Sequence, residues 1–140
     1  MNFSHRALAR TRRGDLPLQL AVASTFLSRL SGLMFRQPLR AEPAGTQGLL
    51  LPECRAVQGC FLRAAVEVVF LCDRGRVVQI SRLDPFGMAL GRAGWHGAPR
   101  HALELPAGCL ARLGLLEGDW ILPLADGGTV ARSVLRWSAA

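Results

Sequence analysis

The side chains that can carry chemistry in this sequence are few, and their spacing matches no familiar catalytic set. The four cysteines are Cys54, Cys60, Cys72 and Cys109. Structural zinc sites usually bring cysteines in pairs separated by two to four residues, and this chain has no such pair. We therefore predict reduced thiols, with Cys54 the most exposed of them, and expect neither a metal site nor a cofactor.

Glu67 is the acidic residue of greatest chemical interest. It lies in an apolar run in which Val69 and Leu71 share its face, so we expect its carboxylate to be half-buried. A carboxylate in apolar surroundings needs a partner. Arg36 and Arg63 are the candidate partners, because a guanidinium group pairs well with a carboxylate. The alternative is that Glu67 faces a ligand.

Other polar residues have simpler interpretations. Glu104 alternates with Ala102 in a short apolar segment and is expected to be a solvated or paired surface acid. Asp119 is expected to shape a turn. The glycine-rich segment 91–97 lacks the strand–loop–helix setting of a phosphate-binding loop, so we expect a flexible loop. Trp95 and His96 are its candidate binding tip.

Hydrophobic patterning predicts a set of short strands joined by turns. Residues 15–23 alternate apolar and polar, and residues 66–80 read as two strands around a turn at 73–75. Further strands are predicted over 47–51, 101–105, 119–124 and 129–136, and residues 57–62 are expected either to form one more strand or to continue the strand that follows them. One helix is expected over 26–34 and another from Pro106 to Leu113, followed by Gly114; residues 84–99 are expected to be a long loop. The fold class is therefore mainly β, a barrel- or jelly-roll-like sandwich with two short helices.

The positive charge is concentrated at the N-terminus. The chain has a net charge of +7, and residues 1–13 contain four arginines and no acid. We predict a basic flexible tail over 1–13 and one compact domain over 14–140. No aromatic residues are interleaved with these arginines, so binding of nucleic acid is the less favoured hypothesis.

Membrane and secretion signals are not recognisable in this sequence. No run approaches the roughly 18 apolar residues that span a bilayer, and the N-terminus lacks the apolar core of a signal peptide. We expect a cytoplasmic protein.

Three separated motifs resemble those of domain-of-unknown-function family 192. They are GLMFRQPL at 32–39, VEVVFLCDRGRVVQI at 66–80 and HALELPAGCLARLGLLEGDWI at 101–121. The resemblance covers roughly residues 16–124. It implies a compact, mainly β fold and brings no established activity with it.

The chain departs from the family pattern at polar positions before the 66–80 hairpin. Gln58 stands where members often have His, Leu62 where they have Met, and Glu67 where they have Asp. An amide neither titrates nor binds metals well, so Gln58 cannot replace a catalytic or metal-binding His. It can replace a hydrogen-bonding one.

These observations favour a non-catalytic binding or accessory domain for a small polar ligand or a protein partner. The predicted ligand-binding residues are Arg36, Gln58, Arg63 and Glu67. One alternative is a hydrolase-like or thiol enzyme that uses Glu67 or Cys54. Another is nucleic-acid binding through the arginine-rich tail.

Overall fold

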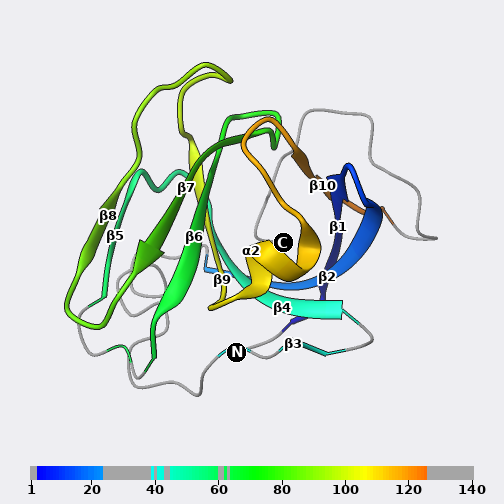
Figure 1. Cartoon of the computed structure of the whole chain (residues 1–140), viewed down its shortest axis with the longest axis horizontal. Helices are drawn as coiled ribbons and strands as arrows, with labels where there is room; N and C mark the ends of the chain where they lie inside the picture. The colour runs from blue at the N-terminus through cyan, green and yellow to red at the C-terminus, as the bar shows by residue number, and fades with distance from the viewer. Residues whose placement is uncertain are drawn as a thin grey trace.

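The computed structural model describes residues 3–23, 39, 41–42, 45–59, 62 and 64–125. They form an eight-stranded curled sheet and a separate two-stranded ribbon (Figure 1). The path of the sheet is β10-β1-β2-β4-β9-β6-β7, in which only β2 and β4 pair in parallel. Its strands are β1 His5–Thr11, β2 Gly14–Val22, β4 Gly45–Leu51, β6 Val66–Leu71, β7 Val77–Leu83, β9 His101–Pro106 and β10 Trp120–Pro123, with β3 Ala41–Glu42 beside β4. The ribbon pairs β5 Ala56–Gln58 with β8 Met88–Leu90, and helix α2 spans Cys109–Leu113.

The two ends of the curled sheet meet at one corner. The backbone N–H of Val77 donates to the carbonyl of Asp119, and the N–H of Ile121 donates to the carbonyl of Gly75, both at 2.8 Å. The Arg76 guanidinium group lies 5.4 Å from the centre of the Trp120 ring. The sheet is therefore a half-barrel whose two end strands, β7 and β10, are in contact near the start of β7.

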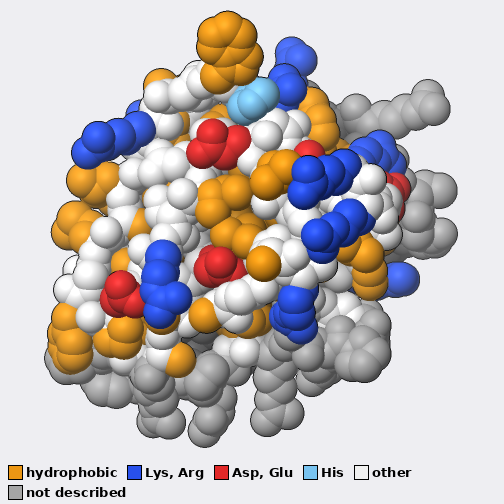
Figure 2. Space-filling model, viewed as in Figure 1, with side chains coloured by type: hydrophobic (Ala, Val, Ile, Leu, Met, Phe, Trp, Pro, Cys, Tyr) orange, Lys and Arg blue, Asp and Glu red, His pale blue; other side chains and the backbone are white. Residues whose placement is uncertain are grey.

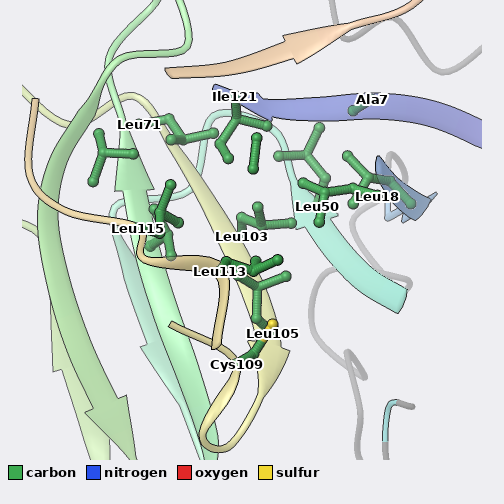
Figure 3. Close-up of a cluster of buried hydrophobic side chains, with 14 residues drawn as sticks. Ala7, Leu18, Leu50, Leu71, Leu103, Leu105, Cys109, Leu113, Leu115 and Ile121 are labelled. Atoms are coloured by element: carbon green, nitrogen blue, oxygen red, sulfur yellow. The ribbon is translucent and has the colours of Figure 1, made fainter. Parts of the chain in front are cut away.

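Alternate side chains fill the inside of this half-barrel, as the two-residue period of a strand requires. Figure 3 shows Leu103 and Leu105 of β9 packed with residues of α2 and Ile121 of β10. This inner cluster consists of Ala7, Ala9, Leu18, Leu20, Leu50, Val69, Leu71, Val77, Leu103, Leu105, Cys109, Leu113, Leu115 and Ile121. Because every strand of the sheet path contributes to it, the inner cluster holds the curl together.

A second apolar layer lies on the other face of the sheet. The β5–β8 ribbon covers part of that face and buries its cross-strand partners Val57 and Ala89 there. This outer cluster consists of Ala21, Ala23, Leu39, Leu49, Leu51, Val57, Leu62, Val66, Val68, Phe70, Val78, Leu83, Ala89 and Ala102. The central strands are consequently buried on both faces.

The mainly β fold and most of the predicted strands are confirmed. Strand β2, strand β4, the β6–β7 hairpin, β9 and β10 all lie where the patterning predicts them. The predicted segments 26–34 and 129–136 lie outside the described residues. In the part of the chain that is described, no helix is long and apolar enough to cross a membrane.

Three predictions about the elements of the fold are wrong. Residues 5–11 are not a flexible tail but form β1, because Ala7 and Ala9 alternate into the inner cluster. Pro106 ends β9 instead of starting the helix, which begins after Gly108, a residue with a φ of 83°. The long loop 84–99 contains β8, which pairs with a strand some thirty residues earlier.

Two of the N-terminal arginines have partners within the domain. Arg10 and Asp15 form a bidentate pair with both distances at 3.0 Å. Arg13 donates to the carbonyls of Ala111 and Arg112 at the end of α2. The Arg10–Asp15 pair links the two strands of the β1–β2 hairpin, and the Arg13 contacts tie that hairpin to α2.

Candidate ligand site

The candidate site is centred on Glu104, in the middle of β9. Its cross-strand neighbours are Leu49 on β4 and Val68 on β6, both buried in the outer cluster. The alternation of β9 places Leu103 and Leu105 in the inner cluster and turns Glu104 to the outer face, with Ala102. Glu104 is only 2% exposed, so its carboxyl group lies in an apolar layer.

The electrostatics of Glu104 follow from this burial. Desolvation disfavours the charged form and raises the pKa of Glu104 to about 8. Within the described part of the chain, its Oε2 atom has no hydrogen-bond partner. At neutral pH the group is therefore a protonated carboxyl that has a hydrogen to donate.

The expectation that Glu104 lies on the surface is wrong. Alternation with Ala102 correctly places the two residues on one face of β9, but the outer cluster covers that face. A strand buried on both faces reads as nearly continuous apolar sequence, and Glu104 interrupts such a run. That interruption is the signal in the sequence that identifies the residue.

Glu67 lies at the start of β6 and is half-buried, as predicted. Its Oε1 atom accepts a hydrogen bond of 3.0 Å from the backbone N–H of Leu110, in the first turn of α2. Its face-mates Val69 and Leu71 belong to the inner cluster. Arg36 and Arg63, its predicted ion-pair partners, lie outside the described residues.

Gln58 does not lie beside Glu67 in the fold. It is exposed on β5, opposite Met88. Strand β5 covers the outer face of the sheet, whereas Glu67 shares a face with residues of the inner cluster. Between these two described residues there is no hydrogen bond, and they lie on opposite sides of the sheet.

The three thiols that the structure describes are buried or half-buried. Cys109 is fully buried, and this burial raises the pKa of its thiol. Cys54 and Cys72 are half-buried beside the outer cluster, and the Cys54 thiol contacts the carbonyl of Ala56 at 3.0 Å. Cys60 lies outside the described residues. Among the residues that are described, no group of three His, Cys, Asp or Glu side chains is arranged to hold a metal ion.

His101 is a buried residue that the sequence did not single out. Its Nδ1 atom accepts a hydrogen bond of 2.9 Å from the backbone N–H of Glu53. Burial lowers the pKa of His101, which favours the neutral ring that this bond requires. Glu53 has a φ of 55° and pairs with Arg100 at 3.2 Å, so His101 supports a constrained turn.

Comparison with known proteins identifies the family. The model of DUF192, described as an uncharacterized ACR, matches residues 8–122. The chain belongs to the DUF192 family. A UPF0127 protein of Pyrococcus furiosus is 28% identical over 113 residues, which cover 78% of this chain and 90% of the relative. A UPF0127 protein of Pyrococcus horikoshii is 30% identical over 94 residues, which cover 64% and 74%.

Two solved structures are similar to this DUF192 chain in fold. One is a candidate transcription regulator from Sinorhizobium meliloti 1021, with a TM-score of 0.71 and 23% identity, covering 88% of this chain and 96% of the other. The second is a protein of unknown function from Novosphingobium aromaticivorans DSM 12444, with a TM-score of 0.66 and 21% identity, covering 83% and 82%. Glu104 is the acid in the LELPAG segment, one of the motifs on which the resemblance to DUF192 rests.

Proposed function

We propose that this DUF192 domain is a non-catalytic binding domain in which Glu104 recognises a small molecule by a hydrogen-bond-accepting group. One observation carries the proposal: the carboxyl group is 2% exposed and its Oε2 atom has no partner among the described residues. A buried polar group without a partner costs about 1–3 kcal/mol, so its presence on a central strand needs an explanation.

The protonation state of Glu104 selects the chemistry of the ligand. A neutral carboxyl can donate through its O–H, which a carboxylate cannot do, and this favours a ligand that presents an acceptor such as a carbonyl or carboxylate oxygen. Leu49 and Val68 flank the acid and suit a short aliphatic body. The net charge of +7 further disfavours an amine and favours a neutral or anionic head group.

Arg36 and Arg63 belong to this proposal although they lie outside the described residues. Their close sequence neighbours Leu39 and Leu62 are buried in the outer cluster, which contains Leu49 and Val68. We propose that their guanidinium groups bind the same acceptor that Glu104 recognises, because a guanidinium group pairs well with a carboxylate.

The test compares three small probes of nearly equal shape by ligand-observed NMR: isobutyramide, isobutyrate and isobutylamine. We expect the amide and the carboxylate to bind the full chain and the amine not to bind. Glu104→Gln should keep isobutyramide binding, because the Gln amide donates where the protonated acid did. Glu104→Leu should weaken binding about tenfold or more, the effect of one unmade hydrogen bond of about 1–3 kcal/mol.

The pH dependence gives a second readout. Isobutyramide affinity should be constant below pH 8 and fall above it in the wild type, and should stay constant in Glu104→Gln. Preferential binding of the amine, with affinity that rises up to pH 8, would mean a cation site and would overturn the proposal. Failure of all three probes to bind, or equal binding to a folded Glu104→Leu protein, would leave Glu104 a purely structural residue.

A further inference from the structure

The β5–β8 ribbon presents one of its faces to solvent. In an antiparallel pair, successive cross-strand pairs point to opposite faces. The middle pair, Val57 and Ala89, points into the outer cluster. The pairs on either side are exposed, and we call their four residues the ribbon face: Ala56, Gln58, Met88 and Leu90.

Apart from Gln58, this face is apolar. Met88 is 66% exposed and Leu90 is 48% exposed, and Phe86, in the turn that precedes β8, is 73% exposed. The backbone N–H of Phe86 donates to the carbonyl of Gly59, which keeps that turn at the end of the ribbon. Figure 2 shows apolar side chains along the edge of the molecule at which Figure 1 places β5 and β8. Large apolar residues gathered on one surface are typical of interaction sites.

The ribbon is fixed to the sheet by the side chain of Gln79 on β7. Its amide nitrogen donates to the carbonyl of Leu90 at 2.9 Å, and its Oε1 atom accepts from the backbone N–H of Arg92 at 2.7 Å. The N–H of Gly91 donates to the carbonyl of Arg55 at 2.7 Å. A surface held in this way loses little conformational entropy when a partner binds.

The charges around the ribbon face differ between its two ends. At the Met88 end, Arg82 and Asp84 form an ion pair at 2.9 Å. At the Leu90 end, Arg55 and Arg92 are both exposed and make no ion pair with any described residue. The apolar face is thus bordered on one side by two arginines available to an acidic group.

We propose that the ribbon face docks a protein partner through a segment that carries apolar side chains followed by an acidic residue. The apolar side chains cover Met88 and Leu90, and the acidic residue lies at the Leu90 end, between Arg55 and Arg92. This docking goes beyond the proposed binding of a small molecule at Glu104, because its residues point away from the sheet.

The experiment selects random twelve-residue peptides displayed on phage against the full chain, followed by fluorescence anisotropy with the enriched peptide. We expect enriched sequences to combine large apolar residues with Asp or Glu. The double variant Met88→Ser/Leu90→Ser should weaken peptide binding at least tenfold. The double variant Arg55→Ser/Arg92→Ser should weaken it several-fold and reduce its salt dependence.

Two controls make the outcome specific. Trp95→Ser removes an apolar side chain that is 96% exposed but lies outside the ribbon face, and should leave peptide affinity unchanged. Glu104→Leu should also leave it unchanged, which separates this proposal from the ligand site. Absence of enrichment, equal binding by Met88→Ser/Leu90→Ser, or a dimer that this double variant dissociates in sedimentation would each overturn the proposal.

Discussion

Burial determines which side chains of this domain can react. Burial favours the neutral ring of His101 and the protonated thiol of Cys109, and keeps Glu104 protonated at neutral pH. A protonated acid is a hydrogen-bond donor, whereas a protonated thiol is a poor nucleophile. The buried groups therefore suit recognition of a ligand better than nucleophilic catalysis.

Glu104 should make the stability of the domain depend on pH. Its pKa is raised from 4.5 to about 8 in the folded chain, so between these values the folded state binds more protons than the unfolded state. The free energy of unfolding should therefore fall as the pH rises from about 4.5 to about 8, by an amount on the order of a few kcal/mol. Glu104→Gln lacks this titration. Its free energy of unfolding, relative to that of the wild type, should therefore increase with pH up to about 8.

Urea unfolding at pH 5, 7 and 9 measures this difference. Glu117→Gln is the matched control, because Glu117 is exposed in a turn and its replacement should change the free energy of unfolding by less than about 0.5 kcal/mol. If the free energies of unfolding of the wild type and Glu104→Gln changed with pH in parallel, the carboxyl group would not be held in its neutral form.

Among the elements, helix α2 depends on a side chain from a distant strand. Its N-cap residue Gly108 has no side chain to bond the first turn, and Glu67 on β6 accepts from the N–H of Leu110 instead. Glu67→Ala should lower the free energy of unfolding by about 1 kcal/mol, the usual effect of losing a helix cap. Glu67→Gln keeps an acceptor oxygen and should lose less.

Thermal or urea unfolding of both variants checks the capping role. Equal stability of Glu67→Ala and the wild type would contradict it. If Glu67→Gln lowered the free energy of unfolding as much as Glu67→Ala does, the charge of Glu67, and not its acceptor geometry, would be what stabilises α2.

The sequence predicts elements well where the signal is local. Strand β2 and the β6–β7 hairpin follow from two-residue alternation around a turn, and Gly114 ends α2 with a φ of 68°. Strand β1 was missed because Ala7 and Ala9 give only a weak apolar pattern.

The site was harder to predict because it depends on contacts between distant parts of the chain. Burial of Glu104 requires the outer cluster to cover β9, and the ribbon requires β5 to pair with β8. Neither is visible in a local pattern. Glu67 was correctly predicted to be half-buried, but its partner is a backbone N–H of a helix 43 residues away.

The whole molecule combines a closed inner core with a covered outer face. The inner cluster draws residues from every strand along the sheet path, whereas the ribbon is fixed chiefly by Val57, Ala89 and the hydrogen bonds of Gln79. The two proposed sites both lie on the outer side of the sheet. The stability of the ribbon is therefore expected to be lower than that of the half-barrel.

Hydrogen exchange should resolve this difference, because local opening needs less free energy where few contacts are buried. We expect the amides of Leu103 and Leu105 in β9 to exchange most slowly, and those of Gly91 and Arg92 to exchange faster. Gln79→Leu removes the acceptor of the Arg92 amide and should speed exchange at Gly91 and Arg92 about tenfold, the effect of roughly one hydrogen bond. Ser81→Ala removes only the bond between Ser81 and Gln79 and should leave both rates nearly unchanged. Equal acceleration in β9 and at Gly91 would mean that the ribbon and the half-barrel open as one unit.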